Sequence, residues 1–92
     1  MTYTPRLLLV DDERSIQRSL TPLLRSRGYE VENAGSGEAA LRAFAARPHD
    51  LVILDLGLPD LEGTEVCRRI RLTSKVPIVV LSARSAEHDK VQ

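Results

Sequence analysis

The chain has 92 residues, and its 13 basic and 13 acidic side chains give a formal net charge of zero. This length fits one small domain, and a hydrophobic fraction of 42% is ordinary for a folded protein and excludes a disordered chain. Zero net charge and only three aromatic residues, Tyr3, Tyr29 and Phe44, argue against direct nucleic-acid binding. No apolar run is long enough to span a membrane, and the single cysteine, Cys67, excludes an internal disulfide and predicts a reducing compartment.

The first half of the chain predicts two strands and two helices in alternation. Residues 7–10 form a continuous apolar run typical of a buried strand. Residues 15–27 carry apolar side chains at helical spacing, and Pro22 is expected to kink this helix. Residues 29–32 alternate apolar and polar side chains, which predicts a strand with one wet face, suited to a sheet edge. Residues 36–47 predict a second helix with the serine at its start as the cap.

The second half repeats the pattern. Residues 51–54 form another continuous apolar run, which ends at Asp55 and precedes a Gly- and Pro-containing loop over residues 56–60. A third helix is expected to begin near Gly63 and to bury two apolar residues, Val66 and Ile70.

Residues 78–81 predict a fourth strand, which ends at Ser82, and Ser85 is a suitable cap for a fourth helix. Four strand–helix repeats predict an α/β domain with a parallel sheet and helices on both faces. In such sheets the functional site lies at the carboxyl ends of the strands.

Acidic side chains gather at these predicted strand ends. Asp11 and Asp12 follow the first strand, Asp55 follows the third, and Ser82 follows the fourth. If the first and third strands are neighbours, three carboxylates converge, and their mutual repulsion calls for a cation. Mg²⁺ binds carboxylates and phosphate oxygens, and Gly57 could add a backbone carbonyl.

A metal, a carboxylate and a hydroxyl suit phosphoryl transfer. Asp55 is the best candidate nucleophile, because a carboxylate can attack phosphorus and form an acyl phosphate. The hydroxyl of Ser82 can donate a hydrogen bond to a phosphoryl oxygen. Taken alone, Asp11 and Asp12 would more often form a turn or cap, and Ser82 a helix cap. Their joint position at the strand ends favours the functional interpretation.

The chain resembles the receiver domain of bacterial two-component response regulators in three segments, residues 8–13, 51–60 and 76–83. The resemblance implies a flavodoxin-like (CheY-like) doubly wound parallel sheet with strand order 2-1-3-4. It implies Asp11 and Asp12 as the acidic metal pair, with Asp12 as the more direct Mg²⁺ ligand. It also implies Asp55 as acceptor of a phosphoryl group from a sensor histidine kinase, Gly57 as a carbonyl ligand, and Ser82 as the hydroxyl beside the phosphoryl group.

The resemblance also implies a fifth strand and a fifth helix, and a lysine at the end of that strand. Neither Lys75 nor Lys90 matches this lysine, so residues 1–92 are expected to form a C-terminally incomplete receiver with impaired phosphorylation. Residues 78–81 would then be an exposed apolar edge, which predicts self-association through the fourth strand and fourth helix.

Residues 54–60 and 80–85 are similar to the winged-helix class of these regulators, and within it to the regulators of potassium-uptake operons. That class implies a cytoplasmic protein that binds DNA only through an output domain absent from these residues. In this family the first helix meets the kinase, which makes Arg14, Ser15 and Arg18 partner candidates.

Two other functions stay open at this point. The first is a magnesium-dependent phosphatase of the haloacid-dehalogenase type, although its Asp-x-Asp motif matches neither Asp11 nor Asp55. The second is a receiver-like module that never takes phosphate. As a receiver, the chain would phosphorylate and dephosphorylate only itself and would not be an enzyme in the usual sense.

Several other residues are expected to be structural. Glu13 and Asp60 are interpreted as caps or solvated charges, and Cys67 as a small core or boundary residue. The remaining candidates are expected at the surface: His49, His88, Arg68, Arg69 and Arg71.

Overall fold

A computed structural model describes residues 3–81 of the chain. In chain order its elements are β1 (Arg6–Val10), α1 (Arg14–Ser26), β2 (Glu30–Ala34), α2 (Gly37–Ala46), β3 (Leu51–Asp55), α3 (Gly63–Arg71) and β4 (Ile78–Leu81). Every strand and helix predicted within this range is present. Ser82 and the helix predicted from Ser85 lie outside the described residues.

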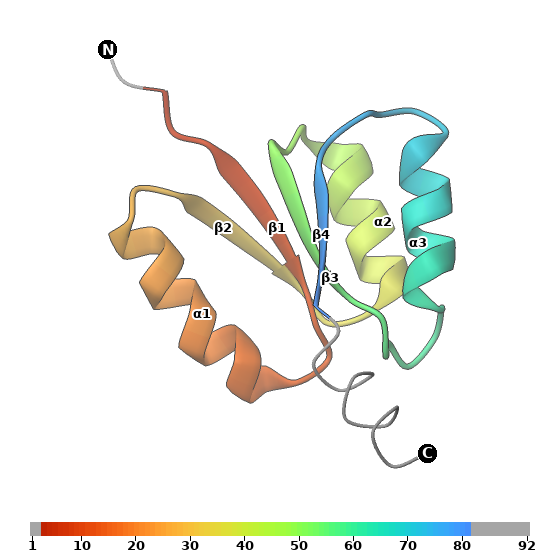
Figure 1. Cartoon of the computed structure of the whole chain (residues 1–92), viewed down its shortest axis with the longest axis horizontal. Helices are drawn as coiled ribbons and strands as arrows, with labels where there is room; N and C mark the ends of the chain where they lie inside the picture. Colours follow the sequence, from red (N-terminus) through yellow and green to blue (C-terminus); the bar gives the residue numbers. More distant parts are fainter. Residues whose placement is uncertain (1–2, 82–92) are drawn as a thin grey trace.

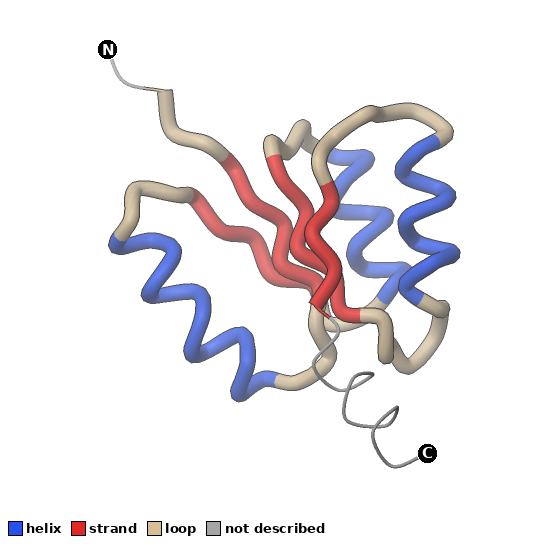
Figure 2. The backbone as a smooth tube through the Cα atoms, viewed as in Figure 1, coloured by secondary structure: helices blue, strands red, loops and turns tan. Residues whose placement is uncertain are grey.

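The four strands form one parallel sheet in the order β2-β1-β3-β4. Figure 1 shows α1 on one face of this sheet and α2 with α3 on the other, and Figure 2 shows the same three layers. The predicted doubly wound α/β sheet and its strand order are therefore confirmed. Because β1 and β3 are parallel neighbours, the residues that follow them emerge side by side at one edge of the sheet.

The core lies mainly between the sheet and the pair α2 and α3. Successive side chains of a strand point to opposite faces, and alternate residues of β1 and β3 face this pair. The four strand residues that face this pair are each 0% exposed: Leu8, Val10, Val52 and Leu54. The helices contribute Ala40 from α2 and, as predicted, Val66 and Ile70 from α3. Cys67 is half-buried against this core, which confirms its interpretation as a boundary residue.

The helix ends follow local sequence signals. The Ser36 hydroxyl accepts a hydrogen bond from the Ala39 amide (3.1 Å), which confirms the predicted cap of α2. Pro22 lies inside α1 and has no N–H to donate, yet the helix continues to Ser26. After α1 the chain turns at Gly28, whose φ of 94° lies in the left-handed region that glycine adopts without strain.

His49 is buried, so the prediction that it lies at the surface is wrong. Its ring stacks on Phe44, with ring centroids 5.8 Å apart, and its Nε2 lies 2.9 Å from Glu32 Oε1. Phe44 belongs to α2 and Glu32 to β2, so an aromatic ring and a carboxylate from two different elements meet the imidazole. His88 lies outside the described residues.

Charged side chains also gather at the amino ends of the strands. Arg6 lies 3.6 Å from Glu30 and 3.4 Å from Glu32, and its guanidinium donates to the Pro48 carbonyl. The Asp50 carboxylate accepts hydrogen bonds from the Tyr3 hydroxyl and from the Arg6 amide. We call these five side chains, Tyr3, Arg6, Glu30, Glu32 and Asp50, the amino-end cluster.

The exposed side of α3 carries an ion-pair network, as expected for a solvated helix face. The Glu65 carboxylate accepts hydrogen bonds from Arg68 Nε (3.0 Å) and Arg69 Nε (2.7 Å). These bonds lower the pKa of Glu65 from 4.5 to about 2. Arg71 instead donates to the Val76 carbonyl and holds the chain that leads into β4.

We expect Glu65→Gln to reduce the acid sensitivity of the fold. A carboxyl whose pKa is lower in the folded chain stabilises the fold above its unfolded pKa, and this contribution disappears as pH falls through the folded pKa. The stability difference between wild type and variant should therefore shrink between pH 4.5 and about pH 2. Because the pair is exposed, the effect is small and decreases with salt. Urea unfolding at a series of pH values measures it, and parallel profiles across this range would contradict the prediction.

Candidate functional site

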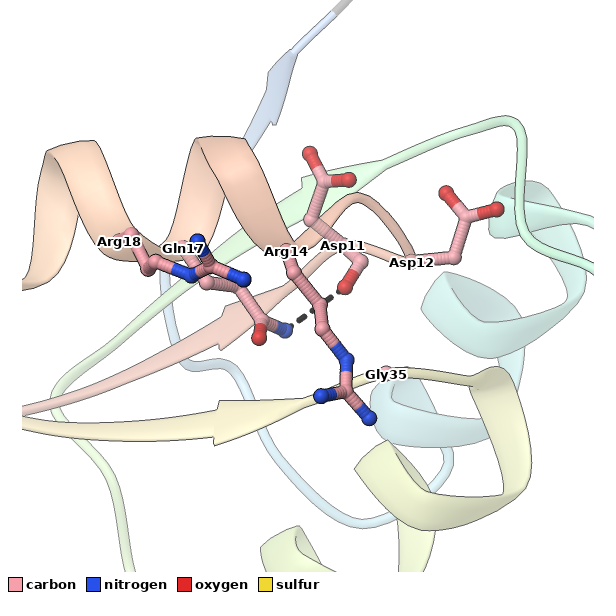
Figure 3. A pocket seen from close by; sticks show the side chains of 6 residues that line it. All are labelled: Asp11, Asp12, Arg14, Gln17, Arg18 and Gly35. Carbon is pink, nitrogen blue, oxygen red and sulfur yellow. Dashed lines mark hydrogen bonds between the residues drawn. The ribbon is translucent and has the colours of Figure 1, made fainter.

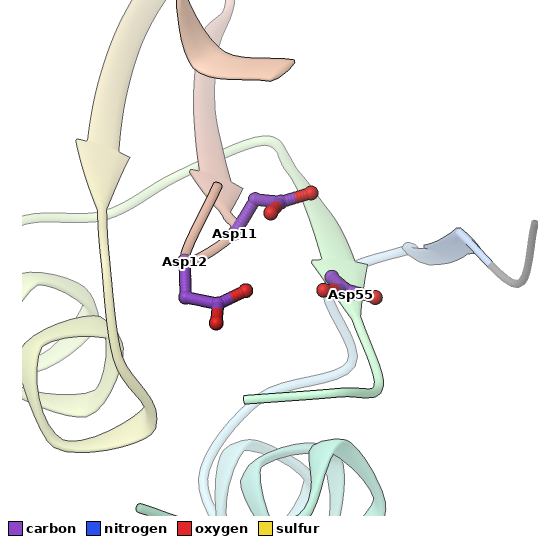
Figure 4. Close-up of side chains that lie close together, drawn as sticks. All are labelled: Asp11, Asp12 and Asp55. Carbon is purple, nitrogen blue, oxygen red and sulfur yellow. The ribbon is translucent and has the colours of Figure 1, made fainter. Parts of the chain in front are cut away.

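Three carboxylates meet beyond the carboxyl ends of β1 and β3. Asp11, Asp12 and Asp55 each offer an oxygen within 4.8 Å of the others, and Figure 4 shows the three side chains gathered beyond the two strands. Asp11 and Asp55 are buried, at 3% and 5% exposed, whereas Asp12 is exposed. The convergence predicted from the strand ends is therefore confirmed. It follows from the parallel pairing of β1 with β3, which aligns Val10 with Leu54.

Hydrogen bonds hold Asp11 in place at the end of β1. The Asp11 carboxylate accepts from the Glu13 amide (2.8 Å), which turns the chain from β1 into α1. The Asp11 amide donates to the Ala34 carbonyl (3.0 Å). The Gln17 amide group donates to the carbonyls of Asp11 (2.7 Å) and Ala34 (3.2 Å), as Figure 3 shows for Asp11. The ends of β1 and β2 are thereby tied to the first turns of α1.

The loop after β3 carries the predicted carbonyl ligand. Gly57 follows Asp55 by two residues, and its amide donates to Asp55 Oδ1 at 3.3 Å. This contact orients the Asp55 carboxylate from the loop side. The loop ends at Gly63, whose amide donates to the Leu56 carbonyl at 3.3 Å. A Cβ on Gly63 would lie 2.8 Å from Leu56 Cα, so the start and end of the loop are in direct contact.

The donor set fits a small, hard divalent cation. Carboxylate oxygens are the ligands that Mg²⁺ takes from proteins, usually one or two of them together with water and phosphate oxygens. Bringing two buried carboxylates and a third exposed one within 4.8 Å concentrates negative charge that a cation would neutralise. Asp11, Asp12 and Asp55 form the only such acidic group among residues 3–81.

Two hollows flank the three carboxylates. An open one of about 480 Å³ lies beside Asp12, and Figure 3 shows Arg14 and Arg18 on its α1 side and Gly35 opposite. A more apolar one of about 300 Å³ lies between α1 and the ends of β3 and β4. Its walls include Ile16, Leu20 and Leu81. The acidic group is therefore accessible to solvent through the hollow that Arg14 and Arg18 line.

Asp60 is a cap, as predicted, but it caps a helix in another part of the sequence. Its carboxylate accepts hydrogen bonds from the Gly37 amide (2.8 Å) and the Glu38 amide (2.9 Å) at the start of α2. The Glu38 and Gly37 amides hold the pKa of Asp60 below its ordinary value. No local pattern around Asp60 indicates this partner. Glu13, interpreted in the same way, occupies the N-cap position of α1 without a side-chain cap bond.

Ser82, the predicted hydroxyl of the site, lies outside the described residues. The last residue of β4 that the structure describes is Leu81, which is paired with Asp55 across the sheet.

Among residues 3–81, no helix has the length and apolar character needed to cross a bilayer.

The fold and the site together define a receiver domain. Residues 7–92 match the response regulator receiver domain family, and the chain belongs to that family. A phosphatase of the haloacid-dehalogenase type is thereby set aside. The chain is similar to the transcriptional regulatory protein KdpE of Mycobacterium tuberculosis, with 50% identity over 86 residues. These residues are 94% of this chain but only 38% of that relative.

Solved structures agree with this assignment. The chemotaxis response regulator CheY4 of Vibrio cholerae matches with a TM-score of 0.83 and 29% identity over 97% of this chain and 81% of its own. A chain in the crystal structure of the histidine kinase ThkA in complex with the response regulator TrrA matches with a TM-score of 0.80. It shares 42% identity over 87% of this chain and 70% of its own. The CheY-like fold class and the assignment as a response regulator receiver domain are therefore both established.

Proposed function

We propose that this receiver accepts a phosphoryl group on Asp55, with Mg²⁺ held by Asp11, Asp12, Asp55 itself and the Gly57 carbonyl. The observation that carries the proposal is the approach of the three carboxylates to within 4.8 Å at the ends of β1 and β3. Asp55 is the proposed nucleophile because it ends the strand beside β1 and its oxygen is oriented by the Gly57 amide. Asp12, the exposed member, is the proposed direct metal ligand.

The proposed reaction moves one phosphoryl group between two proteins. An Asp55 carboxylate oxygen attacks the phosphorus of a phosphohistidine, the new O–P bond forms, and the N–P bond breaks. The histidine ring leaves with the electron pair of the N–P bond and takes a proton, and Asp55 becomes an acyl phosphate. Mg²⁺, when bound, would supply positive charge to the phosphoryl oxygens. Asp11 and Asp12 would hold that charge at the site. Water later attacks the phosphorus of the acyl phosphate, the bond between the Asp55 oxygen and phosphorus breaks, and inorganic phosphate leaves while Asp55 returns to the carboxylate.

We propose that Ser82 donates a hydrogen bond from its hydroxyl to a phosphoryl oxygen. The pairing of Leu81 with Asp55 supports this role, because Ser82 is the next residue in the sequence. A hydroxyl donor there would stabilise charge on the phosphoryl group during transfer. Phosphorylation would then bias a two-state surface of the domain and control an attached output domain.

The proposed phosphodonor is a sensor histidine kinase that docks at the start of α1. The resemblance to the receiver family suggests this surface, and Arg14 and Arg18 line the open hollow beside Asp12. Ser15 lies between them and is exposed. The matching structure that contains a histidine kinase and a response regulator supports the class of partner. By analogy with the transcriptional regulator KdpE, the proposed output is a separate DNA-binding domain, and the proposed location is the cytoplasm.

Phosphorylation by a small donor tests the function. The chain, extended through the fifth strand and helix that the family resemblance implies, is incubated with acetyl phosphate and Mg²⁺ and measured by intact mass spectrometry. We expect one phosphoryl adduct that requires Mg²⁺ and disappears when EDTA is added first. Because the 92 residues contain no match to the family's lysine, we expect them alone to be phosphorylated more slowly. No adduct on the extended chain would contradict the proposal, and equal rates would contradict the role given to the lysine.

We also propose that the 92-residue chain self-associates through β4. This strand is the outer one of the described sheet on the side of β3, and Val79 and Val80 are 48% and 43% exposed. An apolar edge strand offers backbone donors and acceptors to a second copy. Sedimentation should show a dimer that Val79→Lys converts to a monomer, because an edge lysine opposes strand pairing. A wild-type monomer at high concentration would contradict this proposal.

A further inference from the structure

Asp60 joins the loop after β3 to the first turn of α2. Its two carboxylate oxygens accept hydrogen bonds from the Gly37 amide (2.8 Å) and the Glu38 amide (2.9 Å). The same carboxylate accepts from the Leu61 amide at 2.9 Å. The first amides of a helix have no partner within the helix, and the positive end of the helix dipole favours a carboxylate there. Asp60 therefore makes a polar link between segments that are 23 residues apart.

The loop and α2 are also in close apolar contact beside this link. A Cβ on Gly37 would lie 2.8 Å from Leu61 Cβ and 3.0 Å from Val66 Cγ2. Residue 37 therefore leaves no room for a larger side chain, and Leu61 packs directly on the backbone of α2. The link through Asp60 and the contact through Leu61 fasten the loop at neighbouring residues.

The loop fastened in this way contains the proposed metal ligand Gly57. On one side of Gly57 the chain is anchored by β3, and on the other the next polar link to another element is Asp60. The three bonds to Asp60 run to backbone amides, and Asp60 does not belong to the acidic group of the site. The Asp60 carboxylate therefore stabilises the loop and the start of α2, and it is separate from the three carboxylates of the candidate metal site.

We propose that Asp60 is a positioning residue for the metal site, which holds the β3–α3 loop so that the Gly57 carbonyl faces the Asp11, Asp12 and Asp55 carboxylates. This inference rests on the proposed function, because it assumes that Mg²⁺ binds there. The alternative is that Asp60 only stabilises α2. The structure offers a control for that alternative, since the Ser36 hydroxyl caps the same helix by accepting a hydrogen bond from the Ala39 amide within α2.

The test compares Asp60→Ala, Asp60→Asn and Ser36→Ala in the 92-residue chain. Mg²⁺ affinity is measured by calorimetry, the melting temperature by circular dichroism, and the Gly57 amide resonance by NMR in the absence of metal. We expect both alanine variants to melt earlier, because each loses a cap of α2. Only Asp60→Ala should weaken Mg²⁺ binding, by about tenfold as for other residues that support a metal ligand, and shift the Gly57 resonance. Asp60→Asn keeps one acceptor oxygen and should fall between wild type and Asp60→Ala.

The outcomes separate this inference from the proposed function. If wild type binds Mg²⁺ and Asp12→Asn removes that binding, the metal site is supported. If Asp60→Ala and Asp60→Asn then bind Mg²⁺ like Ser36→Ala, with Gly57 unshifted, Asp60 is only a helix cap and the inference is wrong. If wild type binds no Mg²⁺, both the metal site and the inference are wrong. Should Asp60→Ala fail to fold, Asp60→Asn decides between the two roles.

Discussion

Asp55→Asn is expected to abolish the phosphoryl adduct from acetyl phosphate, in the chain extended through the implied fifth strand. An amide oxygen is a far weaker nucleophile than a carboxylate, and the substitution also removes one of the three charges that would attract Mg²⁺. The side chain keeps its shape and the Gly57 amide keeps an acceptor, so the fold should be preserved. The expected result is therefore a complete loss of the adduct in a folded protein, read by intact mass.

Asp50→Asn is the matched control for this experiment. It makes the same chemical change just before the start of β3, where the Asp50 carboxylate accepts hydrogen bonds from the Tyr3 hydroxyl and the Arg6 amide and lies outside the site. We expect its adduct to match that of the wild type and to require Mg²⁺ in the same way. An adduct on Asp55→Asn at wild-type level would place the acceptor elsewhere. Loss of the adduct in Asp50→Asn as well would point to a folding effect.

Leu8→Ala is expected to lower the free energy of unfolding by about 3 kcal/mol. Truncating a fully buried leucine to alanine usually lowers it by about 2–5 kcal/mol. Leu8 is 0% exposed at the centre of β1, and β1 lies between β2 and β3. Truncation leaves a cavity against the core that α2 and α3 cover. For a small domain with a total stability of about 5–15 kcal/mol, this is a large share, and urea unfolding measures it.

Leu72→Ala provides the comparison at the surface. Leu72 follows α3 and is 71% exposed, so the same truncation should change the unfolding free energy by less than about 0.5 kcal/mol. Equal losses in Leu8→Ala and Leu72→Ala would contradict the position of the core. A small loss in Leu8→Ala would mean that β1 is not the buried centre of the sheet.

The acidic site could be predicted from the sequence because it depends on strand order alone. Each of Asp11, Asp12 and Asp55 follows a continuous apolar run, and parallel neighbours bring such positions together. Sequence spacing carries this information directly, and the capping role of Ser36 is equally local. The structure confirms that the three carboxylates converge, whereas the roles of all five site residues in metal binding and phosphoryl transfer remain predictions: Asp11, Asp12, Asp55, Gly57 and Ser82.

The contacts that the sequence did not predict join residues far apart in the chain. His49 is buried because Phe44 and Glu32 meet its ring from two other elements, and no pattern near residue 49 indicates the carboxylate. Asp60 was expected to be a cap or a solvated charge, and it is a cap, but the sequence did not indicate that its partners are the amides of Gly37 and Glu38. Both cases depend on how helices and loops settle on the sheet, which a single sequence does not specify.

The amino-end cluster has a consequence for the electrostatics of the whole domain. It stands at the opposite end of β1 from Asp11, and five strand residues span about 16 Å. Ions at about 0.1 M screen the interaction of solvent-facing charges over about 10 Å, so the solvent-accessible carboxylates of Glu30 and Glu32 interact only weakly with the exposed Asp12 at the other end of the sheet. Charge changes at Glu30 or Glu32 can therefore alter how firmly the amino ends of the strands are held, with little effect on the potential at Asp12.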